Sequence, residues 1–533
     1  MARQKVVLVN PPPFRRLEPE YDTPRFVRLG LAYIAGYLRH FGGCSVEIID
    51  AKFERISFED TIKRILASQP DVAALGAFTC EVKPAAYIAR LIKKQAPHVR
   101  TVLGGVHITA IPEYTAREFP DFDLGVYGEG EVTFAELCAA LRDGGRLDVI
   151  PGLIIRTPDG VVVTPNRDRI ADQDSIPFPA WDLLPRADEY FLMTQRGCPF
   201  NCLYCMNPNG RTARARSIDN LMEELRMVID RYHPRDVTFG DELFSVNMDR
   251  THELLDRMIA EGIQHKVKWS AQTHVHFVDA RLLKKMKRAG AETLGLGIET
   301  GDAEVLKKMG KGTTPDMIIK ASAAAREAGL PIRTFFILGH PNETLDTMNK
   351  TVDLAVQINP KLPIFGIMVP YPGTEIGRLA ATGEGGYRLR TTNWDDYDKQ
   401  LGGALEFANI SRQEIERIQM LAYTKVFLLN GRYLDFLRFC WRYRTEGIAL
   451  LKKILFRRAS KLADNPLPGA ADVLNSVAPG PEVIVDATKQ WQTWQKNDLA
   501  RLKKAGAQAS VVFVELQRNR ASVATLQTKI ASS

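Results

Sequence analysis

Three cysteines stand close together near the middle of the chain, at Cys198, Cys202 and Cys205. Their spacings of four and three would place the thiols on one face of a helix, where they would act as small core hydrophobes. Residues that interrupt helices lie within the same segment, and they favour a loop that leaves a strand. These residues are Gly197, Pro199 and Asn201.

A loop with three thiols can surround one metal centre, because thiolates are the usual ligands of iron–sulfur clusters and of zinc. Three thiolates are one fewer than a closed four-thiolate set contains. In a four-iron cluster, one iron would therefore lack a protein ligand and could bind a small molecule. Zinc binding and ordinary core packing are the alternatives.

The order C-x3-C-x2-C, with Tyr204 before the last cysteine, resembles the cluster loop of radical S-adenosylmethionine (radical SAM) enzymes. The resemblance implies that Cys198, Cys202 and Cys205 hold a [4Fe-4S] cluster and that SAM chelates the remaining iron. Reductive cleavage of SAM would then yield a 5′-deoxyadenosyl radical. Tyr204 would stack on, or pack against, the adenine of SAM.

The elements that must position this loop are indicated by short β-branched runs that alternate with helical patterns. A chain of 533 residues is long enough for about two to four domains. We expect an α/β protein: a doubly wound parallel-sheet domain, a linker, a partial (β/α)6 barrel and a mostly helical C-terminal region. The expected boundaries are residues 1–150, 151–185, 186–410 and 411–533.

In the first domain, the predicted strands alternate with helices, as a parallel doubly wound sheet requires. Ligands of such sheets bind beyond the carboxyl ends of the strands. The predicted strands are Lys5–Asn10, Val46–Asp50, Val72–Phe78, Thr101–Gly104 and Leu124–Tyr127. The loops expected at the ligand-binding edge are residues 11–14, 78–81, 104–112 and 128–131.

Four segments of this domain resemble the cobalamin-binding domain that precedes many radical SAM domains. They are Val9-Asn-Pro-Pro-Pro13, Leu29-Gly-Leu-Ala-Tyr-Ile-Ala-Gly-Tyr-Leu38, Leu103-Gly-Gly-Val-His107 and Gly128-Glu-Gly-Glu131. A nucleotide site is the alternative, but no G-x-G-x-x-G follows the first strand. The resemblance implies that cobalamin is contacted by Gly104, Gly105, His107, Gly128 and Glu129.

The expected axial ligation of that cobalamin is inferred from the absence of a motif. The chain lacks the Asp-x-His-x-x-Gly sequence through which other corrinoid proteins supply a lower histidine ligand. We therefore expect base-off cobalamin without a histidine axial ligand. His107 as an iron or cobalt ligand is the alternative to a loop histidine that hydrogen-bonds locally.

The β/α alternation restarts at Tyr190, and six strand–helix units match the open six-fold barrel of radical SAM enzymes. The predicted strands are Tyr190–Thr194, Asp236–Phe239, Val267–Ala271, Thr293–Gly297, Ile332–Leu338 and Ile364–Val369. Catalytic groups of such barrels sit at the carboxyl ends of the strands. The sequence marks no residue as the catalytic acid, base or nucleophile.

Polar residues at two of these strand ends resemble the SAM contacts of the family. Gly240, Asp241 and Glu242 occupy the place of its motif for the SAM amino group, and carboxylates accept hydrogen bonds from an ammonium. A helix N-cap is the alternative role of Asp241. Glu299, after the fourth strand, resembles the contact to the SAM ribose.

The net charge of +8 becomes conspicuous only at residues 432–461, where aromatic and aliphatic side chains are mixed with nine lysines or arginines. One interpretation is an amphipathic basic helix on a membrane surface or along the access path of an apolar substrate. The other is a solvated helix whose apolar side covers the barrel. A strand–helix–strand piece without an assigned function is predicted at residues 483–516.

No segment reads as a signal peptide, and no apolar run approaches the ~18–20 residues of a membrane-spanning helix. We therefore expect a cytoplasmic protein, which suits an oxygen-sensitive cluster and reduced thiols. The charge distribution does not predict a nucleic-acid partner.

The combined resemblance implies a cobalamin-dependent radical SAM enzyme that C-methylates an unactivated carbon of a specialised metabolite or lipid. It also implies an electron donor such as flavodoxin or ferredoxin. A non-methylating relative, such as the anaerobic oxidative cyclase of magnesium-porphyrin synthesis, is the first alternative. A methylthiotransferase is disfavoured because the first strand and its loop contain no cysteine. A cobalamin- or iron-dependent sensor without turnover is the non-enzymatic alternative.

Overall fold

The computed structural model describes residues 3–14, 27–399, 403–444 and 447–448. The piece predicted at residues 483–516 lies outside the described residues, as do residues 449–461 of the basic segment. The described residues belong to one compact unit.

The N-terminal domain is built on a seven-stranded sheet with the order β2-β1-β3-β4-β5-β6-β7. Its first five strands run parallel, and the last two form an antiparallel hairpin. The order 2-1-3-4-5 is that of a doubly wound sheet with its switch point between β1 and β3. The strands are β1 (Lys5–Asn10), β2 (Ser45–Asp50), β3 (Val72–Gly76), β4 (Arg100–Gly104), β5 (Leu124–Val126), β6 (Leu153–Thr157) and β7 (Gly160–Val163).

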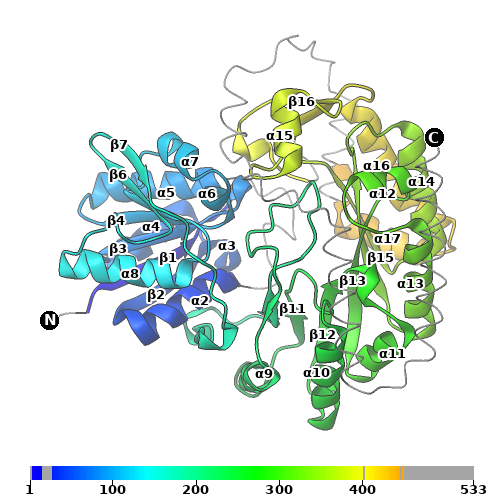
Figure 1. The fold of residues 1–533 in the computed structure, drawn as a ribbon, viewed down its shortest axis with the longest axis horizontal. Coiled ribbons are helices and arrows are strands. Elements are labelled where there is room, and N and C mark those ends of the chain that lie inside the picture. Colours follow the sequence, from blue (N-terminus) through cyan, green and yellow to red (C-terminus); the bar gives the residue numbers. More distant parts are fainter. Residues whose placement is uncertain (1–2, 15–26, 400–402, 445–446, 449–533) are drawn as a thin grey trace, which may run out of the picture. The chain divides into compact units, whose positions relative to one another are not determined.

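Helices cover both faces of this sheet (Figure 1). Successive residues of β1 point to opposite faces, so Val6 and Leu8 belong to one buried cluster and Val7 and Val9 to another. The predicted doubly wound parallel sheet is therefore confirmed. The helices are α2 (Leu29–Tyr37) with the π-helix η1 (Leu38–Gly42), α3 (Ala51–Glu54), α4 (Phe58–Ala67), α5 (Val82–Gln95), α6 (Val106–Ala110), α7 (Pro112–Glu118) and α8 (Gly130–Asp143).

One expectation for this domain was wrong, because residues 104–112 do not form a loop. They contain α6 and the first residue of α7. Gly105 turns the chain at φ +103°, and Pro112 begins the second helix at a position where its missing N–H costs nothing.

The second domain is a six-stranded, entirely parallel sheet with the order β15-β14-β13-β12-β11-β8. Sequential strands are neighbours throughout, which confirms the predicted partial (β/α)6 barrel. The strands are β8 (Glu189–Leu192), β11 (Asp236–Phe239), β12 (Lys268–Thr273), β13 (Ala291–Glu299), β14 (Ile332–Leu338) and β15 (Leu362–Ile367).

The barrel helices follow their strands and begin at residues that can cap them. Each starts after a Ser, Asn, Asp or Thr whose side chain accepts a backbone N–H of the first turn. The caps are Ser217, Asn247, Asp279, Asp302, Thr314 and Thr344. The helices are α9 (Ile218–Tyr232), α10 (Met248–Ala260), α11 (Ala280–Arg288), α12 (Ala303–Lys308), α13 (Pro315–Glu327) and α14 (Leu345–Ile358).

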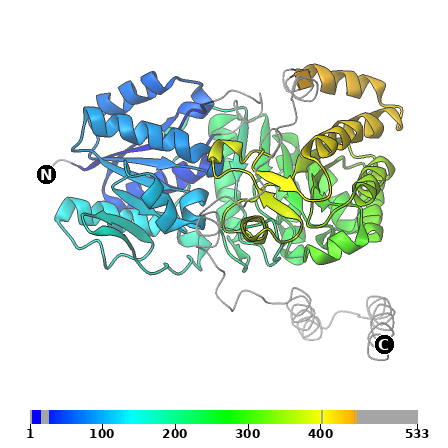
Figure 2. The ribbon, with the colours of Figure 1, turned by 90° about the horizontal axis from the view of Figure 1, so that it is seen from above.

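An additional hairpin, which the sequence pattern does not predict, lies over the end of the barrel (Figure 2). It consists of β16 (Tyr387–Leu389) and β17 (Leu405–Phe407), follows α15 (Glu375–Thr382) and flanks the short helix η7 (Trp394–Asp396). The Tyr387 hydroxyl donates to the Gly339 carbonyl at 2.8 Å. This bond ties the hairpin to the residue that follows β14.

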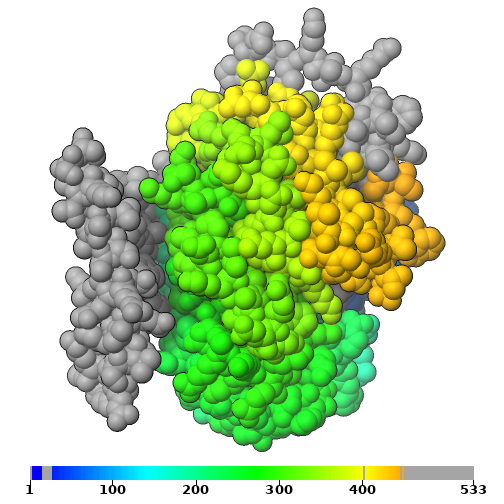
Figure 3. All heavy atoms as spheres, turned by 90° about the vertical axis from the view of Figure 1, so that its right-hand side faces the viewer, coloured from blue at the N-terminus to red at the C-terminus, as the bar shows by residue number. Residues whose placement is uncertain are grey.

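The described C-terminal part is helical, as expected, with α16 (Arg412–Leu428) and α17 (Tyr433–Arg442). The Gln419 side chain donates to the Phe365 carbonyl at 2.7 Å, which fixes α16 against β15. Figure 3 shows α17 (amber) at the surface beside the green barrel helices. Among the described helices, none combines the length and apolarity needed to cross a bilayer.

Candidate active site

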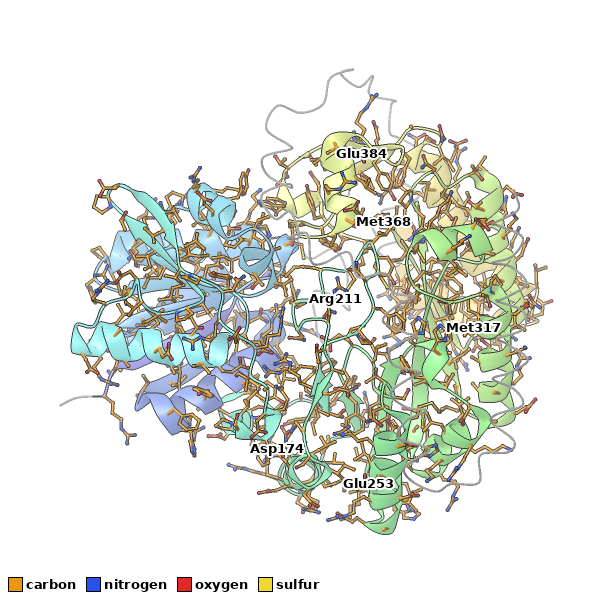
Figure 4. The ribbon with its side chains drawn as sticks, viewed as in Figure 1. Asp174, Arg211, Glu253, Met317, Met368 and Glu384 are labelled. Atoms are coloured by element: carbon orange, nitrogen blue, oxygen red, sulfur yellow. The ribbon has the colours of Figure 1, made fainter. Side chains whose placement is uncertain are left out.

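The three cysteines lie in a loop, residues 197–213, that closes on a two-stranded base. The base pairs β9 (Gln195–Arg196) with β10 (Arg214–Ala215). Gly197 has φ +99°, and any Cβ there would collide with the carbonyl oxygen of Thr212. Only glycine can therefore turn the chain from β9 into the loop. Figure 4 labels Arg211, which lies in this loop and donates to the Phe200 carbonyl.

Backbone hydrogen bonds give the cysteine loop its shape. The Cys198 N–H donates to the Gly210 carbonyl, and the Cys205 N–H donates to the Cys202 carbonyl, both at 3.0 Å. The Asn207 amide donates to the Cys198 carbonyl at 2.6 Å. The structure thus folds the three predicted cluster ligands into one loop, with Cys198 and Cys202 half-buried, Cys205 exposed and none of the three in a disulfide.

The donor set of this loop fits an iron–sulfur cluster. Burial raises the pKa of Cys198 to about 12 and that of Cys202 to about 11, so their thiolates need a nearby positive charge such as iron supplies. Within the described residues, no three His, Cys, Asp or Glu side chains are close enough to share one metal ion. A [4Fe-4S] cluster makes a different demand, because each thiolate binds a separate iron.

The two carboxylates after β11 bind the protein itself. Both oxygens of the buried Asp241 are used: Oδ1 accepts the Thr194 N–H at 2.7 Å and the Gln195 N–H at 3.2 Å, and Oδ2 accepts the Thr194 hydroxyl at 2.5 Å. Glu242 accepts the Gly197 N–H at 3.2 Å and the Asn209 amide at 2.5 Å. These carboxylates therefore tie the end of β11 to the cysteine loop.

These contacts change the interpretation of residues 240–242, which follow β11. The N-cap interpretation of Asp241 was wrong, because α10 begins later and is capped by Asn247. Burial raises the pKa of Asp241 to about 6. Gly240 packs so closely on the Phe191 ring that a Cβ would overlap it. Contacts of Gly240, Asp241 and Glu242 with SAM stay a prediction, and the half-buried Glu242 is the more accessible carboxylate.

The fourth strand ends on a buried ion pair. Glu299 has φ +70°, and its carboxylate binds the Lys311 ammonium, which also donates to the Gly297 carbonyl at 2.7 Å. Burial, together with Cys202 and Glu299, raises the pKa of Tyr204. The residues predicted to contact the ribose and adenine of SAM therefore meet beside the cysteine loop. Lys311 is marked in the sequence only by its flanking glycines.

Buried imidazoles complete this side of the barrel. His274, after β12, stacks on Phe200 of the cysteine loop with ring centroids 4.3 Å apart. His340, after β14, is fully buried, and its ring nitrogens make no well-aligned hydrogen bond, although the backbone of Glu299 and of Ile337 lies near the ring. His274 Nε2 likewise makes no well-aligned hydrogen bond, and the backbone of Lys311 lies near its ring. Burial lowers the pKa of His340 to about 4, so the ring is neutral at pH 7. Buried nitrogens without a well-aligned hydrogen bond can turn to a ligand.

The residues predicted to contact cobalamin divide into two groups. Gly105 must be glycine, since a Cβ would lie 2.6 Å from the Ala77 carbonyl oxygen. Gly104 precedes it at the end of β4. Gly128, at φ +80°, borders open space and donates its N–H to Thr109 at 3.1 Å. Glycines at this edge leave room for a bulky ligand.

The charged and aromatic members of that set are already engaged. His107 is fully buried, lies 3.4 Å from the Thr79 hydroxyl through Nδ1, and packs edge-on against Trp394. Burial lowers its pKa to about 3. His107 is therefore bonded locally through Nδ1, while its Nε2 has no hydrogen-bond partner among the described residues. Glu129 binds Arg214, at the base of the cysteine loop, and both of its oxygens take part.

Comparison with known proteins identifies both domains. Residues 192–355 match the radical SAM superfamily, and residues 23–138 match the B12 binding domain. The uncharacterized methyltransferase PH0819 of Pyrococcus horikoshii is 33% identical over 438 residues, which cover 80% of this chain and 93% of that protein. The anaerobic magnesium-protoporphyrin IX monomethyl ester cyclase of Cereibacter sphaeroides is 29% identical, over 65% of this chain and 59% of the cyclase.

Among solved structures, the fold is similar to the radical SAM methyltransferase TsrM of Kitasatospora setae with cobalamin and a [4Fe-4S] cluster bound. The TM-score is 0.63, the sequence identity is 18%, and the match covers 80% of this chain and 89% of TsrM. At that identity the likeness concerns the fold.

Proposed function

The chain belongs to the radical SAM enzymes that carry a B12-binding domain, and we propose that it methylates an unactivated carbon of a small metabolite or lipid. Its cofactors are a [4Fe-4S] cluster, SAM and cobalamin. The observation that carries the proposal is the contact between Arg214, at the base of the cysteine loop, and Glu129 of the B12-binding domain. Two cofactor-binding loops joined in this way can serve one substrate between them.

When bound, SAM and the cluster supply a radical that takes a hydrogen atom from the substrate, and methylated cobalamin supplies the methyl group. Cys198, Cys202 and Cys205 would hold the cluster. Glu242 and Glu299 would orient the amino group and the ribose of SAM, and the neutral His340 can donate one hydrogen bond and accept another. The sensor alternative loses its support, because the family and the relatives are enzymes.

Electron supply belongs to the same proposal. Radical methylation of this kind would need two electrons in each turnover, one for cleavage of SAM and one for the cobalamin. A one-electron carrier such as flavodoxin or ferredoxin is the proposed donor. The cytoplasmic location and the absence of a nucleic-acid partner stay predictions from the sequence.

The products of SAM test the proposal. Anaerobic protein with cobalamin, SAM, reductant and a candidate substrate should form 5′-deoxyadenosine and S-adenosylhomocysteine together. A cell extract from a strain that lacks the gene, searched for metabolites without one methyl group, supplies the substrates to try. Deoxyadenosine and converted substrate without S-adenosylhomocysteine would contradict methylation and indicate the cyclase class.

We also propose that residues 432–461 contact an anionic membrane surface. Tyr433, Leu437 and Trp441, on the outward side of α17, are 62%, 62% and 72% exposed. The opposite side packs Phe439 against Tyr423 of α16. Arginines adjoin the exposed apolar stripe, and Arg444 lies over the Trp441 ring. An apolar stripe with flanking cations is typical of helices that lie in a membrane interface.

Vesicle flotation tests the membrane contact. The protein should float with vesicles that contain phosphatidylglycerol and remain below with pure phosphatidylcholine. Leu437→Ser/Trp441→Ser should abolish flotation. Val149→Ser/Val162→Ser, which removes exposed apolar side chains of the other domain, is the matched control. Equal flotation of both double variants would contradict the proposal.

A further inference from the structure

The base of the cysteine loop carries two arginines directly opposite each other. Arg196 on β9 and Arg214 on β10 are cross-strand partners in an antiparallel pair. Like charges at such positions destabilise a sheet unless something neutralises them. The two-stranded base therefore depends on groups outside itself.

Two carboxylates of the B12-binding domain supply that neutralisation. Glu129 holds Arg214 in a bidentate pair at 2.5 and 3.0 Å, and Glu131 holds Arg196 at 2.6 Å. A Glu129 oxygen also lies 3.7 Å from Arg196, which links the four side chains into a chain of alternating charges, Arg214–Glu129–Arg196–Glu131. All four side chains are at most 10% exposed.

Further contacts join these four side chains to the linker, to α2 and to the cysteine loop. Glu129 accepts the Ile170 N–H at 2.9 Å, and Arg214 donates to the Ile170 carbonyl at 2.6 Å, so the linker between the domains is bound to them. The Arg196 guanidinium lies over the Tyr33 ring of α2, 5.0 Å from its centroid. Arg214 also donates to the Asn209 carbonyl within the cysteine loop at 2.9 Å.

The carboxylates stand at the ligand-binding edge of the first sheet. Glu129 and Glu131 follow β5 directly and begin α8, and Gly128 immediately before them borders open space. The arginines stand at the two ends of the loop that carries the cluster cysteines. This chain of charges thus joins the loop expected to face cobalamin to the loop expected to hold the cluster.

We propose that Glu129, Glu131, Arg196 and Arg214 form a positioning clamp that sets the spacing between the cluster and cobalamin. The clamp is needed for transfer of the methyl group and not for cleavage of SAM. Buried, bidentate charge pairs hold a fixed geometry, because water cannot replace either partner. A misplacement of about 1 Å can cost up to about 100-fold in a step that depends on orientation.

The test uses the holoprotein with both cofactors and the variant Glu129→Gln. Pulsed EPR measures how strongly the reduced cluster enhances the relaxation of cob(II)alamin, which reports their spacing without any turnover. The variant should keep its iron and cobalamin content and show a changed or broadened relaxation enhancement. With substrate, deoxyadenosine formed per methyl transferred should rise by about 10-fold or more. Glu131→Gln should act in the same direction.

Matched controls separate positioning from stability. Glu261→Gln breaks a more exposed carboxylate–arginine contact between α9 and α10, away from both cofactor loops, and should change neither readout. Glu129→Asp keeps the charge and should fall between wild type and Glu129→Gln. If Glu129→Gln retains both cofactors with unchanged spacing and product ratio, the proposal is overturned.

Loss of cobalamin alone from Glu129→Gln would also overturn it, because Glu129 would then be a cofactor contact. The methylation proposed above enters only the product ratio. The EPR spacing therefore tests the clamp even if the chain performs other radical chemistry.

Discussion

The two ligand-binding edges of the molecule use buried polar groups in opposite ways. At the edge of the first sheet, charges satisfy one another: Arg28 binds Glu81 at 2.6 Å and Asn10 at 2.8 Å, and Lys52 binds Glu81 at 3.0 Å. At the barrel edge, His274 Nε2, the ring nitrogens of His340 and one oxygen of Glu343 make no well-aligned hydrogen bond, although polar groups lie near them. Among the described residues, the first edge carries one such group, His107 Nε2.

This difference indicates that the two edges bind different kinds of ligand. A closed network of charges at the switch point makes a rigid floor for a large cofactor that binds through its shape. Unpartnered buried groups cost free energy unless a ligand satisfies them. The barrel edge is therefore arranged for a polar ligand such as SAM. Changes to the edge of the first sheet should lower the stability of the protein. Changes to the barrel edge should alter ligand binding and the dependence of stability on pH.

The largest effect should come from the cluster ligands. Cys202→Ala should abolish the cluster, measured as loss of bound iron and of its visible absorbance, because the remaining thiols cannot complete the set. Cys440→Ala removes an exposed cysteine of α17 and is the control. Unchanged iron in Cys202→Ala would refute the ligand assignment.

Breaking the closed network should cost stability rather than chemistry. Although burial alone would raise it, Arg28 and Lys52 hold the pKa of Glu81 at about 2. Arg28→Met would leave this buried carboxylate with one cation and should lower the free energy of unfolding by about 3–5 kcal/mol in denaturant titrations. Arg146→Met removes the exposed pair with Asp148 and should cost less than about 1 kcal/mol. Equal losses would contradict the contrast.

At the barrel edge, the folding stability of the protein should depend on pH through the buried carboxyl of Glu343. Burial raises the pKa of Glu343 to about 7, although its other oxygen accepts the Gly339 and His340 N–H groups. A raised folded-state pKa means that its stabilising contribution is complete below about pH 4.5 and is lost as pH rises through 7. The decrease in the free energy of unfolding as pH rises should be smaller in Glu343→Gln, by up to about 3 kcal/mol. Parallel stability–pH curves for the two proteins would contradict the assignment.

The smallest effect should concern SAM binding. Lys311→Met leaves Glu299 without its cation and free to rotate, so the affinity for SAM should fall by about tenfold, which is about 1.4 kcal/mol. Equilibrium dialysis of the cluster-loaded protein measures it. Lys350→Met, which removes a half-exposed lysine bound to Asp302 and Asp346, is the control. No difference between the two variants would remove Lys311 from the pocket.

Much of the fold is readable from local sequence. β1, β11 and β14 have the bounds that the β-branched runs predict, and the barrel helices begin after side chains that cap them. The β16–β17 hairpin could not be predicted in this way. Its strands are three residues long and are separated by η7, so no periodic pattern develops.

The roles of the motif residues were only partly readable. The preference for glycine at a position of positive φ follows from the backbone conformation of that residue itself, as at Gly105. The resemblance singled out the carboxylates of Asp241 and Glu129 as cofactor contacts, which stay predictions, and it did not indicate their partners within the protein. Asp241 binds Thr194, and Glu129 binds Arg214 at a separation of 85 residues.

The sequence by itself determined the cysteine spacing, the strand and helix periods and the glycine turns, because each depends on neighbouring residues. Only the tertiary structure decided which charges meet: Glu299 with Lys311, Glu129 with Arg214, and His107 with Trp394. Glu299 and Lys311 meet within the barrel, on either side of α12. The other two contacts depend on how the two sheet edges and their loops face each other, which follows from the packing of whole domains and is encoded by no local pattern.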